Sequence, residues 1–247
     1  MILLIKKKFL LGNKTSNKSI SINKSITIKE IPDFQKGTWW VQNYSSMAPL
    51  TMIKNLENKK IADIGSAPGG KLFQILTRNS NVESFEKNLN RVNILKENLK
   101  RLNFKCNINI VNFLNFKTDK KFDLIILDTP CSSIGTIRKN PEIFFRKNRQ
   151  DLNKYILIQK KLLNKSVKLS RKNSLIIYMV CSFLEEETTK QIDNFLKFNK
   201  NFDIEKFKTS DYKKLVDSFG YINIFPTTIN NKVKIDGFFA AKIKRND

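Results

Sequence analysis

The sequence contains no histidine and only three cysteines among its 247 residues. Without histidine, the protein has no His-ligated metal, no histidine general base and no Ser–His–Asp triad. The cysteines (Cys106, Cys131 and Cys181) are odd in number and lack CxxC spacing, which argues against both a disulfide framework and a zinc site. We therefore expect no metal ion and a reducing, cytoplasmic environment.

Long hydrophobic runs are also missing. The N-terminal apolar run ends at Ile5, directly before Lys6–Lys8, and this order of charge is the reverse of that in a signal peptide. No stretch is long enough to span a bilayer. We expect a soluble protein that does not insert into a membrane.

Acidic residues are scarce relative to basic ones. Lys and Arg number 46 against 22 Asp and Glu, so the formal net charge is +24. This imbalance favours a polyanionic partner, with nucleic acid ahead of a membrane surface. The alternative is a basic surface that only keeps the protein soluble.

A turn of small residues is the feature around which the chain is organised. Ile61–Ile64 predicts a buried strand, and a helix with one apolar face follows the turn. Such units open nucleotide-binding α/β folds, because small residues let a ligand approach backbone N–H groups. The turn matches neither GxGxxG nor GxxxxGK[ST], which makes pyrophosphate a less favoured ligand, and an ordinary turn remains the alternative. Its residues are Gly65, Ser66, Ala67, Pro68, Gly69, Gly70 and Lys71.

Strand and helix patterns alternate through the rest of the chain. This alternation predicts an α/β fold with a doubly wound, mostly parallel sheet that binds ligands at the carboxyl ends of its strands. The further predicted strands are 81–86, 107–111, 122–127, 174–180 and 236–243, and the helices are 90–103, 152–170 and 185–198.

The first 36 residues differ in composition from the rest. They are rich in Lys, Asn and Ser, and weak alternation predicts a basic N-terminal arm (1–36) with one or two short strands. The main domain then covers 37–247. Trp39 and Trp40 near its start are either core residues or, beside the polar Gln42–Asn43, the border of a ligand pocket.

Polar residues gather where the predicted strands end. Glu86 ends the second strand, where an acid accepts hydrogen bonds from ribose hydroxyls, although a surface glutamate is the alternative. Asp128 follows an apolar strand directly. The vicinity of Asn112 lies at the end of the third strand.

Two of the cysteines share the same setting. A lone cysteine is more often a small core hydrophobe, and we assign Cys106 to that class. Cys131 and Cys181 each precede a serine at the ends of strands predicted to be neighbours, which favours reactivity. The thiolate is the reactive form, so a nearby cation must lower the thiol pKa, and Lys71 is the candidate.

Five motifs in this chain resemble, in order and spacing, those of the Sun/nucleolar-protein family of RNA cytosine-carbon-5 methyltransferases. The entry segment, Gly37 to Gln42, is most similar to the branch that acts on bacterial small-subunit (16S) ribosomal RNA. The resemblance covers roughly residues 31–245. Its motifs are Asp63–Lys71, Leu127–Ser132, Gly135–Pro141, Val180–Ser182 with Glu185–Glu187, and Asp236–Ala240.

The resemblance implies a Rossmann-like methyltransferase with a seven-stranded, mostly parallel sheet, helices on both faces, and S-adenosyl-L-methionine as cofactor. It makes 37–247 the catalytic domain and the arm a remnant of an RNA-binding region, with ribosomal RNA as the favoured partner. The residues implied to bind the cofactor are the turn Gly65–Lys71, Glu86, Arg91, Asn112 and Asp128.

The resemblance also assigns the two thiols. The cysteine of the later motif, Cys181, is implied to be the nucleophile that attacks carbon 6 of cytosine, and Cys131 is implied to help release the product. Asp128 and Lys71 would hold the base by its polar edge. The basic, aromatic loop 138–149 would grip phosphates or stack bases, or is simply a solvated loop.

Several positions depart from the family pattern. Glu86 and Asn112 stand where the family usually has Asp, Val180 replaces a Thr before the nucleophile, and Gln42–Asn43 replaces Gln-Asp. None of these changes removes a reacting group, and we expect Asn112 to weaken cofactor binding. The arm is too short for the RNA-binding domain that bacterial relatives usually carry. Two other functions stay open, a nitrogen methyltransferase on the same fold and a catalytically degenerate RNA-binding module.

Overall fold

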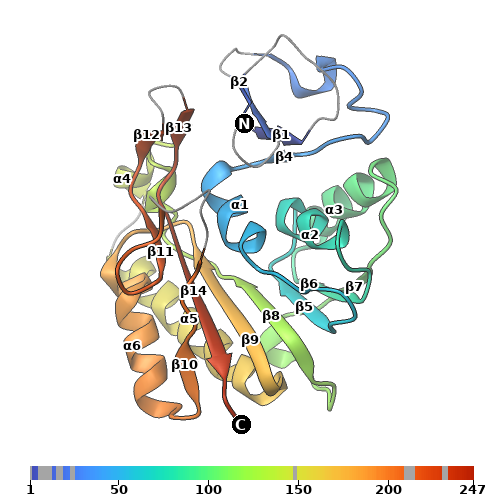
Figure 1. Ribbon diagram of the computed structural model, residues 1–247. Helices are drawn as coiled ribbons and strands as arrows, with labels where there is room; N and C mark the ends of the chain where they lie inside the picture. The colour runs from blue at the N-terminus through green and yellow to red at the C-terminus, as the bar shows by residue number, and fades with distance from the viewer. Residues whose placement is uncertain are drawn as a thin grey trace.

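A mixed eight-stranded sheet forms the centre of the protein (Figure 1). The computed structural model describes residues 2–4, 13–14, 19–22, 26–146, 149–208, 215–229 and 233–247. Seven strands run in the order β10-β14-β9-β8-β5-β6-β7, and β11 pairs with β14 beside this path. The strands are β5 (Ile61–Ile64), β6 (Val82–Glu86), β7 (Asn107–Ile110), β8 (Phe122–Asp128), β9 (Ser170–Val180), β10 (Phe202–Ile204), β11 (Ile222–Ile224) and β14 (Phe238–Arg245).

The five strands β5 to β9 are parallel to one another, and β14 runs antiparallel to β9. The chain moves outward from β5 to β6 and β7, then returns to β8 on the other side of β5. The strand order therefore reverses between β5 and β8. In open α/β sheets, ligands bind in the crevice that forms at such a reversal. The mostly parallel α/β fold predicted from the sequence is confirmed.

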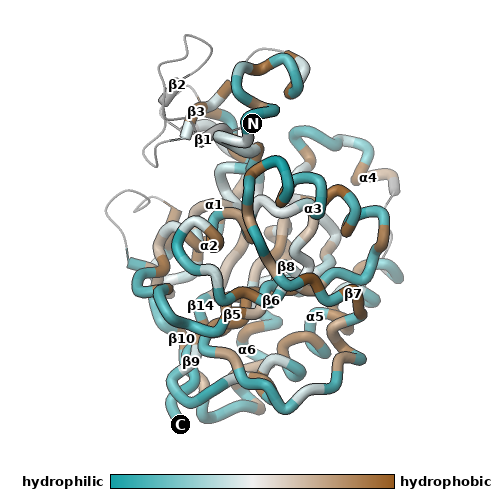
Figure 2. The backbone as a smooth tube through the Cα atoms, turned by 90° about the vertical axis from the view of Figure 1, so that its right-hand side faces the viewer, coloured by the Kyte–Doolittle hydropathy of each residue, from teal (hydrophilic) through white to brown (hydrophobic). Residues whose placement is uncertain are grey.

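Helices cover both faces of the sheet and create two hydrophobic cores. Side chains alternate along each strand, so Leu124 and Ile126 of β8 pack in one core and Ile125 and Leu127 in the other. The hydrophobic stretches gather toward the inside of the molecule (Figure 2). The first core includes residues of α1 (Tyr44–Thr51), α2 (Gly70–Leu76) and α3 (Leu89–Arg101), and the second those of α5 (Arg149–Leu169) and α6 (Thr189–Phe198).

The helix predicted over 185–198 is divided in the structure. A short 3-10 helix, η4 (Glu185–Glu187), comes first, and α6 begins only at Thr189. Thr188 between them has φ −118° and ψ −106°, which is not a helical conformation. The break turns Glu187 into the protein interior, where its side chain is fully buried.

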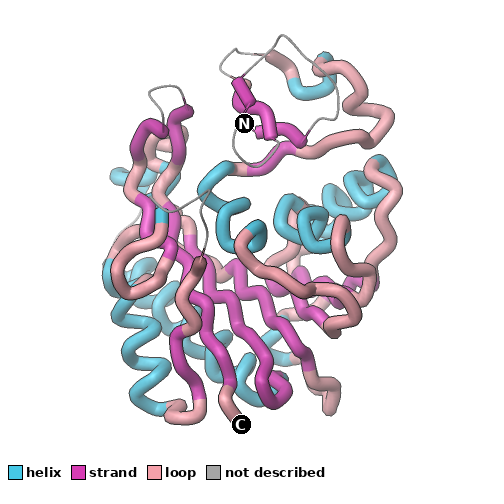
Figure 3. Tube along the Cα trace, viewed as in Figure 1, coloured by secondary structure: helices cyan, strands magenta, loops and turns pink. Residues whose placement is uncertain are grey.

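The N-terminal segment contributes a separate small sheet above the main one (Figure 3). Its strand order is β2-β3-β1-β4, and all its pairs are antiparallel. Because β1 pairs with β4, this small sheet joins the predicted arm to residues that follow the predicted boundary at 36–37. The strands are β1 (Ile2–Leu4), β2 (Asn13–Lys14), β3 (Ser19–Ser21) and β4 (Val41–Gln42).

The remaining elements are short. Within the predicted loop 138–149 lies a four-residue helix, α4 (Ile143–Arg146). A hairpin is formed by β12 (Thr227–Ile229) and β13 (Val233–Ile235), and 3-10 turns occur at η1 (Ile28–Glu30), η2 (Phe113–Asn115) and η3 (Ile134–Thr136). None of the helices in the described part of the chain is both long and apolar enough to cross a membrane.

A matched pair of substitutions on α3 tests this packing. Leu95 is fully buried in the first core, whereas its neighbour Ile94 is 48% exposed. Leu95→Ala should lower the free energy of unfolding by about 3 kcal/mol, because it removes buried methyl groups and leaves a cavity. Ile94→Ala should cost less than about 1 kcal/mol. Urea denaturation of both variants measures the difference, and equal losses would contradict the assigned face of α3.

Candidate functional site

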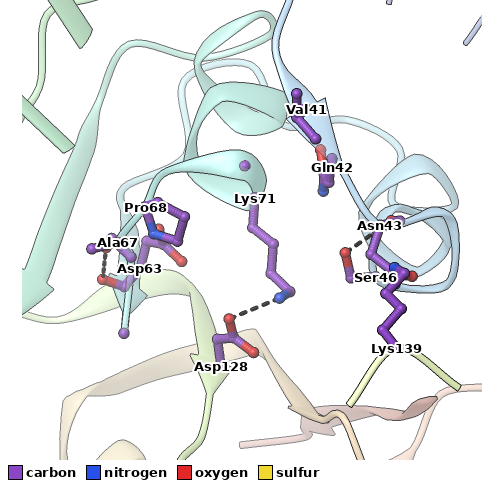
Figure 4. Close-up of a pocket in the computed structure, with 13 residues that line it drawn as sticks. Val41, Gln42, Asn43, Ser46, Asp63, Ala67, Pro68, Lys71, Asp128 and Lys139 are labelled. Atoms are coloured by element: carbon purple, nitrogen blue, oxygen red, sulfur yellow. Dashed lines mark hydrogen bonds and ion pairs between the residues drawn. The ribbon is translucent and has the colours of Figure 1, made fainter. Parts of the chain in front are cut away.

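A cavity of about 360 Å³ lies at the carboxyl ends of β5 and β8, where the strand order reverses (Figure 4). The small-residue turn forms one wall, and Asp63 and Asp128 lie at the strand ends. The segment Val41–Asn43, Ser46 and Lys139 form the opposite side. The turn predicted from sequence to approach a ligand is therefore part of the cavity wall.

Two glycines in the turn have backbone conformations that other residues rarely adopt. Gly65 has φ +80° and Gly69 has φ +118°. A Cβ atom at Gly65 would lie 2.5 Å from the backbone oxygen of Asp128, and one at Gly69 would lie 2.0 Å from the ring of Phe73. Both positions therefore require glycine, and the turn is held tightly against β8 and α2.

Lys71 and Asp128 form an ion pair across the floor of the cavity (Figure 4). The Lys71 Nζ donates to Asp128 Oδ2 at 2.7 Å. Burial, the largest single influence, disfavours the charged ammonium, but the combined attraction of Asp128, Cys181 and Asp63 outweighs it, and the pKa of Lys71 is raised. The two residues that the resemblance assigns together to holding the base thus form one ion pair.

Asp63 begins the first motif, but sequence reasoning gave it no role in the site. It lies on β5, lines the cavity, and is fully buried. Neither oxygen of its carboxylate has a hydrogen-bond partner among the described residues. Burial raises the pKa of Asp63 to about 7. The available signal was an acidic residue inside the otherwise apolar run Ile61–Ile64, where an unpaired charge is costly.

The other residues predicted to bind a cofactor lie outside the lining of this cavity. Glu86 is buried at the end of β6 and accepts hydrogen bonds from the backbone N–H groups of Lys87 and Asn88. Arg91 pairs with Glu86 at 3.3 Å and donates to the backbone oxygen of Ala67, so it connects β6 to the turn.

Asn112 has a local structural partner. It is exposed, and its side chain accepts a hydrogen bond from the backbone N–H of Leu114 at 3.1 Å, which caps the 3-10 helix η2. A cofactor role for Asn112 therefore stays a prediction.

Cys131 and Cys181 follow the adjacent parallel strands β8 and β9, in which Asp128 is paired with Met179. Their loops are joined directly, because the Gly135 N–H donates to the Cys181 carbonyl at 3.0 Å. A Cβ atom at Gly135 would lie 2.2 Å from the Gly237 carbonyl oxygen, which leaves no room for a side chain. Neither thiol lines the cavity beside the turn.

Both thiols are protonated in the free protein at neutral pH. Burial raises the pKa of Cys181 to about 12, and the attraction of Lys71, which acts in the opposite direction, is too small to offset it. Burial and the nearby Glu187 raise the pKa of Cys131 to about 11. The expectation that Lys71 would lower the pKa of Cys181 is right in direction, but desolvation of the thiolate outweighs it.

Cys106 has the structural role assigned to it from sequence. Its Sγ donates to the Val82 carbonyl at 3.2 Å, and the residue packs against the first core. Trp39 and Trp40 are also buried. The Trp40 indole donates to the side chain of Gln42, and it is Gln42, not the tryptophans, that borders the cavity.

Asp236 holds two basic residues of the predicted loop 138–149. This buried carboxylate accepts hydrogen bonds from Arg138 at 2.8 Å and from Asn43, and it pairs with Lys139 at 2.5 Å. Further along, Phe144 and Phe145 on α4 are 66% and 93% exposed. The described residues contain no cluster of three or more metal-ligating side chains.

Comparison with known proteins decides the family. The family model described as 16S rRNA methyltransferase RsmB/F matches residues 50–244 of the chain. The chain belongs to this family. The match includes the turn, both cysteines and Asp236, and it confirms the resemblance predicted from the motifs.

Curated relatives of this RsmB/F chain carry related names. Ribosomal RNA small subunit methyltransferase B of Photorhabdus laumondii is 30% identical over 201 residues, which cover 79% of this chain and 47% of that protein. A probable ribosomal RNA small subunit methyltransferase B of Coxiella burnetii is 27% identical over 237 residues, covering 92% and 54%. The chain spans about half the length of these relatives.

Solved structures share the fold. NSun6 from Pyrococcus horikoshii, solved with SFG, has a TM-score of 0.77 at 21% identity and covers 90% of this chain and 57% of its own. A methyltransferase homologue from Pyrococcus horikoshii has a TM-score of 0.75 at 23% identity, covering 92% and 75%. These likenesses confirm the Rossmann-like methyltransferase fold.

The unpartnered carboxylate makes stability depend on pH. Native Asp63 keeps its proton up to about pH 7, whereas its ordinary pKa is 3.8. The folded state thus binds more protons, and the free energy of unfolding should fall as pH rises from about 4 to 7. Asp63→Asn should remove this part of the slope and stabilise the protein above pH 7 by roughly 1–3 kcal/mol.

Urea denaturation at several pH values measures this effect in the protein without added ligand. Glu97, which is exposed on α3, provides the control variant Glu97→Gln, which should keep the wild-type slope. A slope unchanged by Asp63→Asn would contradict the raised pKa.

Proposed function

We propose that this protein transfers a methyl group from S-adenosyl-L-methionine to carbon 5 of a cytosine in RNA. The observation that carries the proposal is the convergence of two cysteine loops, at the ends of β8 and β9, beside the Lys71–Asp128 pair. A cysteine-dependent reaction at a pyrimidine needs this combination of a nucleophile, a second thiol and charged groups for the base.

The cavity suits a cofactor of this kind. Its volume of about 360 Å³ lies in the range of small-molecule sites. S-adenosyl-L-methionine carries an ammonium and a methylsulfonium group, the latter being the source of the methyl group. The unpaired Asp63 carboxylate, buried at the cavity wall, would gain the cation that it lacks. Gly65 and Gly69 let the turn pack closely against Asp128 and Phe73 and so keep it in the conformation that forms the cavity wall.

Arg91 and Glu86 would support this site from its edge. Arg91 donates to Ala67 within the turn while it pairs with Glu86, so it fixes the turn relative to the end of β6. Glu86 already accepts two backbone hydrogen bonds through one oxygen, and its other oxygen, which pairs with Arg91, accepts no hydrogen bond. That oxygen would be available to a ribose hydroxyl.

The two thiols divide the chemistry. Carbon 5 of cytosine is a poor nucleophile. When the Cys181 sulfur adds to carbon 6, carbon 5 becomes enamine-like and can accept a methyl group. Lys71 and Asp128 would hold the polar edge of the base as charge develops. After transfer, the proton on carbon 5 leaves to a base, the bond from carbon 6 to sulfur breaks, and Cys131 assists this release.

Cys181 must lose its proton before or during attack. Its pKa of about 12 in the free protein means that the thiolate is scarce at neutral pH. Lys71 lies close enough to favour the thiolate, and it is held by Asp128. Reactivity would therefore be confined to the complex in which a base occupies the site, which protects the thiol from unrelated reagents.

RNA would approach from the side of Lys139, which lines the cavity. A target base must leave its stack to reach the half-buried Cys181 and the buried Cys131. Arg138 and Lys139 provide positive charge, although each also pairs with Asp236. The exposed rings of Phe144 and Phe145 are suited to stacking on unpaired bases. The names of the relatives favour 16S ribosomal RNA as the substrate, which would place the reaction in the cytoplasm.

Cys181→Ala should abolish methyl transfer, a decrease of at least about 10³-fold, because no other thiol can form the adduct. Cofactor binding should persist, since the turn is untouched. Methylation of carbon 5 in 16S ribosomal RNA is measured by bisulfite sequencing, and cofactor binding by calorimetry. Cys106→Ala is the control and should retain activity. Undiminished activity of Cys181→Ala would remove the nucleophile role, and absence of cofactor binding in the wild type would favour a degenerate RNA-binding module.

Cys131→Ala should have a different outcome. If Cys131 assists release, its loss leaves methylated RNA attached to Cys181, and the complex should appear as a slow band on a denaturing gel. The double variant with Cys181→Ala should lose this band. A Cys131→Ala protein that turns over without an adduct would show that release does not need the second thiol.

A further inference from the structure

The serines that follow the two cysteines point toward each other. Ser132 Oγ and Ser182 Oγ lie 3.3 Å apart, and both side chains are buried. Each serine is adjacent in sequence to a thiol, so this contact fixes the distance between the two cysteine-bearing loops. The Ser182 hydroxyl also accepts from the Leu184 N–H at 3.2 Å, which anchors the second loop locally.

Glu187 is a second hydrogen-bond partner of Ser132. Its Oε1 accepts from the Ser132 backbone N–H at 2.8 Å, and its Oε2 accepts from the Ser132 hydroxyl at 2.5 Å. Glu187 therefore fixes both the backbone and the side chain of the residue next to Cys131. The Ser132 hydroxyl donates to Glu187 and is left to accept from Ser182, which sets the direction of the chain of hydrogen bonds.

The helices on this face of the sheet keep Glu187 in place. Gln159 of α5 donates to Glu187 Oε1 at 3.1 Å and to the Pro130 carbonyl at 2.9 Å. Gln191 of α6 donates to Gln159, and the Tyr178 hydroxyl donates to the Glu187 carbonyl at 2.7 Å. The break in the helix at Thr188 directs the carboxylate into this network instead of into solvent.

We propose that Glu187 is a positioning residue of the reaction: it fixes Cys131 relative to Cys181 through Ser132 and Ser182. The inference rests on the proposed function, because it concerns the release step assigned to Cys131. Glu187 is fully buried, and its hydrogen bonds go to protein groups, so it acts through Ser132 and does not touch the base.

The charge of Glu187 has a second effect on the same thiol. After burial, repulsion from Glu187 is the next contribution that raises the pKa of Cys131. Lys71, in contrast, favours the thiolate of Cys181. The two loops are therefore joined by hydrogen bonds, and the strongest charged neighbour is an acid, Glu187, at Cys131 and a cation, Lys71, at Cys181, while burial keeps both thiols protonated at neutral pH.

The test compares substitutions at Glu187 in the full chain, with 16S ribosomal RNA and S-adenosyl-L-methionine. Glu187→Ala removes the acceptor. Glu187→Gln keeps the shape of the side chain. The glutamine oxygen would accept from the Ser132 N–H, and its amide would donate to the Ser132 hydroxyl. The Ser132 hydroxyl would then donate to Ser182 instead of accepting from it. Glu186→Ala is the matched control, because Glu186 is an exposed neighbour of the same charge.

Three quantities are measured for each variant: cofactor affinity, methyl transfer in a single turnover, and the fraction of RNA held as adduct on a denaturing gel. Glu187→Ala should increase the adduct fraction about tenfold while cofactor affinity stays within about twofold of wild type. Glu187→Gln should return the adduct fraction to within about threefold of wild type, and Glu186→Ala should not change it. A general loss of structure would weaken all three quantities together.

Ser132→Ala keeps the inference testable if Glu187→Ala does not fold. It removes the hydroxyl link to Ser182 but leaves the bond from the Ser132 N–H to Glu187, so it should also increase the adduct fraction. Normal release by folded Glu187→Ala or by Ser132→Ala, in a wild type that methylates carbon 5, would overturn the positioning role alone. A wild type that neither methylates nor forms an adduct would overturn the proposed function and this inference with it.

Discussion

Parallel pairing of β5, β8 and β9 is the constraint on which the site depends. In the register of the sheet, Ile64 is paired with Leu127, and Asp128 with Met179. Backbone hydrogen bonds of a parallel sheet fix this alignment for whole strands at once. The residues that follow the three strands therefore emerge at one edge, although 116 positions separate Gly65 from Cys181 in the numbering of the chain. A shift of β9 by one residue would turn Cys181 to the other face of the sheet.

Buried carboxylates around this edge fall into two kinds. Glu187 and Asp236 each accept hydrogen bonds from several donors and hold loops in place. Asp63 accepts none through its side chain in the described structure. Burial of an unpaired charge is unfavourable, and in folded proteins it is usually removed by a partner or by protonation. Asp63, at the cavity, keeps its proton up to about pH 7, and a bound cation would stabilise its charged form.

Sequence patterns predicted the parts of the fold with strong periodicity. The strand Ile61–Ile64 has the predicted bounds, and the helix on 90–103 is displaced by one or two residues at its ends. The three-residue strands β10 and β11 were not predicted, because so short a segment shows no period and forms only by pairing with β14. The break at Thr188 was also missed, because residues 185–191 are all polar and provide no apolar period that would mark where the helix begins.

The candidate site, like the fold, could be predicted from the sequence only where a local pattern marks the residues. The residues of the turn and both cysteines were recognisable, because each lies in a motif that directly follows a predicted strand. Asp63 and Glu187 lie within the motifs, but sequence reasoning assigned them no role, because their roles depend on burial and on partners from distant elements such as Gln159. The pKa of Cys181 also lay beyond sequence reasoning, since it is decided by the balance between desolvation and one lysine.

The close packing at Gly135 limits how the molecule can respond to a bound polymer. Its N–H bonds to the Cys181 carbonyl, and its own carbonyl accepts from the Gly237 N–H at 2.7 Å. Three segments that are distant in sequence thus meet backbone to backbone, with no side chain between them that could change rotamer. If the proposed RNA substrate binds, the opening that admits a nucleotide would occur farther out, toward α4, where the exposed rings of Phe144 and Phe145 can move while the geometry of the sulfur atoms is preserved.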